Sequence, residues 1–98
     1  MIELVEKTET ETLKPDLVDI YYKNDNKTTF DFVIFSIVKY FNKSPQEAIL
    51  IATQIHENGE GKVAENVLKS IAKTKIKNVT QIARQEGFPL EVFYKDCR

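Results

Sequence analysis

The sequence has very little cysteine, histidine or tryptophan, and these absences exclude several classes of protein. Its 98 residues include one cysteine, Cys97, one histidine, His56, and no tryptophan. A single cysteine cannot form a disulfide within the chain, and one histidine with one cysteine supplies too few ligands for a structural zinc site. We therefore expect no metal, no cofactor and a reducing compartment, the cytoplasm.

An excess of charge and a long apolar run are also missing. With 14 basic and 15 acidic residues the formal net charge is −1, so no overall field attracts nucleic acid or an anionic membrane. The longest apolar run, residues 32–35, is too short to span a bilayer, and the acidic first residues are unlike a signal peptide. We expect one small soluble domain, a monomer without nucleic-acid or membrane partners.

The first residues differ in pattern from the rest of the chain. Residues 1–16 alternate threonine with glutamate and offer little to bury, which predicts a flexible N-terminal extension. Residues 17–98 have the pattern of one folded domain. Within it, alternating apolar and polar residues predict strands over residues 18–23 and 90–95, and a short third strand is predicted over residues 62–67.

Two helices are predicted between the first two strands. Apolar residues recur at helical spacing over residues 30–41, with Thr28 as the predicted N-cap and Asp31 three residues later. The stretch "SPQE", residues 44–47, begins the second helix with a serine cap and a proline at the first helical position. Gly59 is predicted to end this helix in the left-handed conformation.

A third helix carries apolar residues from Leu68 to Ala83 and is predicted to stop at Gly87. The element order is therefore β-α-α-β-α-β. Three strands cannot bury a sheet face by themselves, so we expect an α+β fold in which a small three-stranded antiparallel sheet packs against three helices.

The third predicted helix carries a row of lysines at a spacing of four residues: Lys69, Lys73 and Lys77. The ordinary interpretation is a solvated face opposite the apolar stripe. A contact face for an acidic partner is the alternative. RNA binding is a third, but no aromatic residues interleave with the lysines to stack on bases.

Motifs that would indicate an enzyme or an ion site are incomplete. The stretch "HENGE", residues 56–60, lacks the second histidine of a zinc-protease helix. "GEGK", residues 59–62, lacks the upstream glycine of a phosphate loop and the serine or threonine that follows its lysine. "NDNKTT", residues 24–29, lacks the glycine and the closing glutamate of a calcium loop. We expect no catalytic residues.

A series of short motifs, taken in order, carries a resemblance to a known family. The motifs are Asn24-Asp25-Asn26, Thr28, Phe30-Asp31-Phe32-Val33, Ile55-His56, Ala72-Lys73-Thr74-Lys75 and Gly87-Phe88-Pro89-Leu90. No single one is specific, but in this order and spacing they resemble ClpS, the adaptor of the Clp protease. The likeness runs from about Pro15 to Tyr94 and includes an acidic extension ahead of the domain.

The resemblance implies a non-enzymatic adaptor of the N-end rule. Such a protein binds substrates whose first residue (the N-degron) is Leu, Phe, Tyr or Trp and delivers them to a Clp AAA+ unfoldase, whose N-terminal domain it contacts. The implied site consists of α-amine ligands at Asn24, Asn26 and His56, additional turn contacts at Asp25 and Thr28, a hydrophobic pocket at Phe30, Val33, Ala52, Ile55 and Leu90, and an unfoldase-docking residue at Lys75.

The chain departs from the family pattern inside this implied site. Asn26 stands where aspartate is usual, and Phe30 and Ala52 stand where methionine is usual. Two other functions stay open: a divergent relative that docks on the unfoldase without reading N-termini, and a ribosome-associated module of similar fold. Neither of them needs an amine site, so Asn24 together with His56 favours the adaptor.

Overall fold

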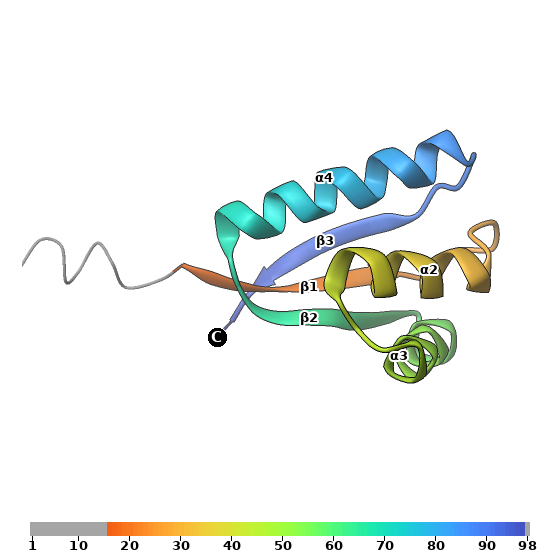
Figure 1. Ribbon diagram of the computed structural model, residues 1–98, viewed down its shortest axis with the longest axis horizontal. Helices are drawn as coiled ribbons and strands as arrows, with labels where there is room; N and C mark the ends of the chain where they lie inside the picture. Colours follow the sequence, from red (N-terminus) through yellow and green to blue (C-terminus); the bar gives the residue numbers. More distant parts are fainter. Residues whose placement is uncertain (1–15, 98) are drawn as a thin grey trace, which may run out of the picture.

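The computed structural model describes residues 16–97 as three strands and three helices. In chain order they are β1 (Leu17–Lys23), α2 (Phe30–Phe41), α3 (Pro45–Asn58), β2 (Glu60–Leu68), α4 (Lys69–Gln85) and β3 (Glu91–Asp96). The strands form one antiparallel sheet in the order β2-β1-β3 (Figure 1). The predicted α+β fold and its element order are confirmed. The extension predicted over residues 1–16 lies, apart from Asp16, outside the described residues.

The central strand β1 separates the core from the open face of the sheet. Val18, Ile20 and Tyr22 are fully buried and share one core with side chains from all three helices, while the residues between them point to the other face. One buried pair links strand and helix, because the Tyr22 hydroxyl lies 2.7 Å from Ser36 Oγ. Burial raises the pKa of the Tyr22 phenol far above its usual range. No helix in residues 16–97 is long and apolar enough to cross a membrane.

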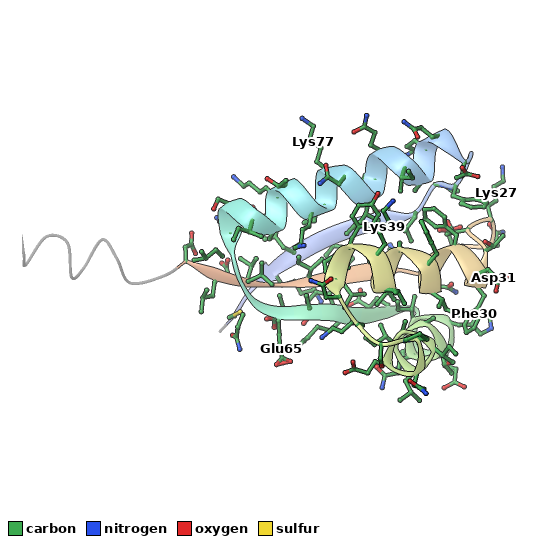
Figure 2. The ribbon with its side chains drawn as sticks, viewed as in Figure 1. Lys27, Phe30, Asp31, Lys39, Glu65 and Lys77 are labelled. Carbon is green, nitrogen blue, oxygen red and sulfur yellow. The ribbon has the colours of Figure 1, made fainter. Side chains whose placement is uncertain are left out.

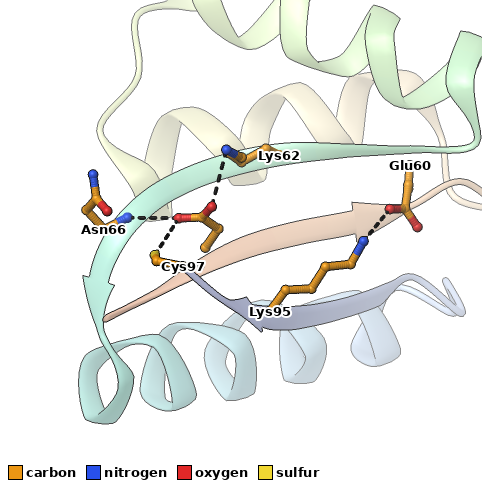
Figure 3. A network of polar contacts seen from close by, with 6 residues as sticks. Glu60, Lys62, Asn66, Lys95 and Cys97 are labelled. Atoms are coloured by element: carbon orange, nitrogen blue, oxygen red, sulfur yellow. Dashed lines mark hydrogen bonds and ion pairs between the residues drawn. The ribbon is translucent and has the colours of Figure 1, made fainter. Parts of the chain in front are cut away.

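On the open face, Asp19 of β1 contacts Lys62 and Asn66 of β2 and Cys97 after β3; Figure 3 labels these three partners. Its carboxylate accepts hydrogen bonds from the Cys97 thiol at 2.9 Å and the Asn66 backbone N–H at 3.0 Å, and it pairs with Lys62 at 3.2 Å. The Cys97 bond, followed by the Asn66 bond, holds the pKa of Asp19 below its usual value. The same bond raises the pKa of the Cys97 thiol, so this thiol stays protonated at neutral pH.

The caps of α2 and α3 agree with those predicted from the sequence, with one correction. Ser44 and Glu47 form the predicted capping box of α3, and Gly59 ends that helix at φ 89°. The N-cap of α2 is Thr29, whose hydroxyl accepts from the Phe32 N–H at 3.1 Å, and not the predicted Thr28. Thr28 instead lies in the preceding turn, where its N–H and its hydroxyl both donate to Asp25.

Candidate functional site

A cavity of about 420 Å³ lies where the β1–α2 loop meets the start of α2 and the last turns of α3. This volume falls within the range of about 300–1,000 Å³ typical of small-molecule sites. One side of the wall is polar and the other apolar. The lining residues are Asn24, Asp25, Asn26, Thr28 and His56 on the polar side and Phe30, Val33, Ala52 and Ile55 on the apolar side.

The apolar floor of the cavity is built by two packed helices. Val33 from α2 and Ala52 and Ile55 from α3 are nearly inaccessible to solvent in the domain core. Phe30, at the first position of α2, is 44% exposed and lies at the mouth instead; Figure 2 shows it at the end of α2 that faces α3. The floor is therefore fixed by the core, and the mouth is set by one aromatic ring.

The polar side depends on a turn that Asp25 organises. Its carboxylate accepts from the Lys27 N–H at 2.8 Å and from both the N–H and the hydroxyl of Thr28 at 2.7 Å. Partial burial raises the pKa of Asp25, but the bonds from Thr28 and Lys27 outweigh it, so the pKa of Asp25 lies below its usual value. Asp25 is therefore a carboxylate at neutral pH, and the asparagines on either side of it are left available.

The turn is joined to the end of α3, which brings His56 to the same cavity. The Asn24 N–H donates to the Gly59 carbonyl at 2.8 Å, and Gly59 is the left-handed C-cap of α3. His56 lies in the last turn of that helix. The loop and the helix end are far apart in the sequence but meet at one end of the molecule (Figure 1).

The structure brings together all the predicted site residues except two. Leu90 is 1% exposed and belongs to the core, and it is not among the residues that line the cavity. Its backbone is fixed there by Arg84, which donates to the carbonyls of Leu90 and Phe88 at 2.9 Å. The predicted apolar pocket is therefore formed without the Leu90 side chain.

Lys75 lies away from the cavity, on α4. Its Nζ donates to the Tyr40 carbonyl at 2.7 Å and lies 5.7 Å from the centre of the Phe41 ring. A cation at the C-terminal end of α2 is favourable there, because the last carbonyls of a helix carry partial negative charge. The half-buried Lys75 thus links α4 to α2.

Gly61 supports the cavity and was not singled out in the sequence. An added Cβ at this position would lie 2.7 Å from Ile55 Cγ1, closer than real Cβ contacts come. Glycine is therefore what lets β2 approach α3 so closely, and Ile55 forms the cavity floor. Gly61 precedes the strand predicted over residues 62–67 but lies inside the observed β2, so the sequence pattern gave no signal for this contact.

Gly61→Ala is expected to push Ile55 into the cavity and to lower the free energy of unfolding by about 1–3 kcal/mol, the usual cost of overpacking a core. Chemical denaturation measures the free energy of unfolding. Peptide titration measures the affinity, which should fall because the cavity is narrower. Glu65→Ala, at an exposed position of the same strand, is the matched control and should change neither. Unchanged stability in Gly61→Ala would show that Ile55 moves aside without cost.

The arrangement suits binding better than catalysis. Hydrogen-bond acceptors from a rigid turn and a helix end stand beside an enclosed apolar floor, as a site for a polar chain end with an attached side chain requires. Within residues 16–97 no group of three or more His, Cys, Asp or Glu side chains is placed to hold a metal ion. The fold and the cavity define a small α+β domain with a binding cavity that is polar on one side and apolar on the other.

The sequence profile of the family described as "ATP-dependent Clp protease adaptor protein ClpS" matches residues 14–93. The chain belongs to this family, which consists of adaptors and not of enzymes. The match confirms the resemblance carried by the motifs between Asn24 and Leu90, and it argues against a ribosome-associated module.

Individual relatives agree with the family assignment. The Clp protease adapter protein ClpS of Deinococcus radiodurans is 41% identical over 83 residues, which cover 85% of this chain and 73% of the relative. The corresponding protein of Shewanella loihica is 40% identical over 87% of this chain and 82% of its own length. Among solved structures, Agrobacterium tumefaciens ClpS2 bound to L-phenylalaninamide is similar with a TM-score of 0.80 and 26% identity, covering 85% of this chain and 99% of that chain.

Proposed function

We propose that this chain binds proteins that begin with a bulky hydrophobic residue (Leu, Phe, Tyr or Trp) and delivers them to a Clp AAA+ unfoldase. The observation that carries the proposal is the single cavity in which Asn24, Asn26 and His56 stand beside an apolar floor. The ligand of the Agrobacterium ClpS2 structure supports it, since phenylalaninamide is a phenylalanine with a free α-amine.

The α-amine is held by the polar side of the cavity. An ammonium group only donates hydrogen bonds, so it needs acceptors around it. The side chains of Asn24, Asn26 and His56 take part in none of the hydrogen bonds within residues 16–97, which leaves their acceptor atoms available. Asn26 is neutral, and the nearest fixed negative charge on this wall is the Asp25 carboxylate, whose lowered pKa keeps it ionised.

The first side chain of the substrate enters the apolar part of the cavity. Transferring a leucine or phenylalanine side chain from water to an apolar site is worth about 1.5–3 kcal/mol. Val33, Ala52 and Ile55 are already buried and ordered by the core, so binding does not require them to give up conformational freedom. Phe30 at the mouth decides which side chains can pass.

Delivery is assigned to other parts of the chain. We place the binding function in residues 17–98, the contact with the N-terminal domain of the unfoldase at Lys75, and the delivery step in the extension, residues 1–16; the family membership supports each assignment. The adaptor would act as a monomer in the cytoplasm, where the Clp protease works.

The test is degradation of a reporter that begins with phenylalanine by the cognate Clp unfoldase and its peptidase. Adding the full chain should accelerate degradation, and a reporter that begins with serine should not respond. If the chain changes the degradation of both reporters equally, it regulates the unfoldase without reading N-termini, and the proposed function is wrong.

A further inference from the structure

A second and larger hollow lies between α4 and β3, at the edge of the sheet. It has a volume of about 720 Å³ and shares no residue with the first cavity. Its lining is mainly apolar, from Ile76, Val92, Phe93 and Tyr94, and Lys73 and Lys77 stand at its rim. We call this hollow, lined by residues of α4 and β3, the edge groove.

The edge groove also exposes a strand edge. Because the strand order is β2-β1-β3, the outer side of β3 has no partner strand among residues 16–97. Such an edge presents backbone N–H and C=O groups that can pair with an added extended segment. In Figure 1, α4 runs alongside β3, so a segment added there would lie between strand edge and helix.

The rim of the edge groove favours an acidic occupant. Lys73 and Lys77 are exposed and one turn apart on α4, and neither is paired in any salt bridge within residues 16–97. Figure 2 shows Lys77 projecting from α4 into solvent. Lys69, one turn earlier, is already engaged by Asp16 at 3.7 Å. The row of lysines therefore begins at Lys69, which pairs with Asp16, and continues with Lys73 and Lys77 along the edge groove.

We propose that residues 2–13 of this chain dock in the edge groove as an added, extended segment. These residues combine four glutamates (Glu3, Glu6, Glu9 and Glu11) with apolar Ile2, Leu4, Val5 and Leu13. The glutamates match the charge of Lys73 and Lys77, and the apolar residues match the floor of Ile76, Val92 and Tyr94. This inference does not depend on the proposed function of the first cavity.

The attachment point of the segment makes this docking geometrically easy. The Lys69 N–H at the start of α4 donates to the Asp16 carbonyl at 2.9 Å, and the Cys97 N–H donates to the Leu17 carbonyl at 3.3 Å. The chain therefore enters β1 between the first turn of α4 and the end of β3. An extended chain covers about 3.3 Å per residue, so residues 2–13 are long enough to run beside the six residues of β3.

The covalent link also lowers the affinity that the groove must supply. A segment attached a few residues away is present at an effective concentration on the order of millimolar. A few charge pairs and a shallow apolar contact are then enough to keep it in place. The edge groove would hold the extension against the domain until a partner, or high salt, removes it.

Paramagnetic relaxation enhancement on the full chain tests this inference. A nitroxide is attached at Thr8→Cys in a Cys97→Ser background, and amide signals of the ¹⁵N-labelled chain are measured. Signals of residues 73–80 and 92–94 should lose most of their intensity, and should recover in about 1 M salt, which screens exposed charge pairs. Recovery is also expected in Lys73→Glu/Lys77→Glu, but not in the matched control Lys27→Glu/Lys39→Glu, whose two lysines lie on the β1–α2 loop and on α2.

Three results would overturn the inference. The first is unchanged intensity at residues 73–80 and 92–94, and the second is equal broadening in the groove variant and the control. The third comes from a mixture of two chains, one with ¹⁵N and no nitroxide, the other with the nitroxide and no ¹⁵N. Broadening of residues 73–80 and 92–94 in this mixture would show that the segment occupies the groove of a second copy.

Discussion

Asn24→Ala and His56→Ala are each expected to weaken the binding of a phenylalanine-initiated peptide by about 1.5–3 kcal/mol, or roughly 10- to 150-fold in Kd. Each change removes an acceptor from the polar side of the cavity, and a hydrogen bond to a charged group is worth more than a neutral one. Neither side chain makes a hydrogen bond within residues 16–97, so folding should be unaffected. Peptide titration followed by fluorescence anisotropy measures the loss.

A matched control separates this loss from indirect effects. Gln54→Ala, at an exposed position of α3, should bind like the unmodified chain. Full affinity in both alanine variants would show that Asn24 and His56 do not bind the α-amine.

Phe30→Ala is expected to admit peptides that begin with isoleucine or valine, which the unmodified chain should reject. Phe30 lies at the cavity mouth, and its ring cannot bend aside as a flexible side chain can. A β-branched side chain is widest at its first carbon, where it would meet this ring. The small Ala52 leaves room for an aromatic side chain at the floor, so Phe, Tyr and Leu should bind. Discrimination of about 1–3 kcal/mol is expected.

A peptide panel that differs only at the first residue measures this selectivity. Phe35→Ala is the matched control, because Phe35 lies on the same helix and is 47% exposed, close to the 44% of Phe30, yet it does not line the cavity. The control should keep the original selectivity. If the unmodified chain binds isoleucine as tightly as leucine, Phe30 is not the gate.

Local signals in the sequence predicted the elements that carry the site. The alternation of Val18, Ile20 and Tyr22 predicted the buried face of β1, and the capping box at Ser44 predicted where α3 begins. Adjacent threonines were harder to separate. Thr28 and Thr29 can both cap a helix, and the structure shows that Thr28 donates to Asp25 in the turn whereas Thr29 caps α2.

Contacts between distant elements could not be predicted in the same way. The order of motifs brought Asn24, Asn26 and His56 to one site, but it also assigned Leu90 to the cavity wall, where the structure does not place it. An apolar residue at the start of a strand can face a pocket or the core, and the sequence does not distinguish the two. The need for glycine at position 61 likewise depends on how closely β2 approaches Ile55, which no local pattern encodes.

The most direct test of the central claim compares two fluorescent peptides that begin with phenylalanine and differ only in N-terminal acetylation. Acetylation removes the charged donors and leaves the aromatic side chain unchanged. If Asn24, Asn26 and His56 hold an α-amine, the free peptide should bind and the acetylated peptide should lose at least about 2 kcal/mol, roughly 30-fold in Kd. Equal binding of the two peptides would contradict the account.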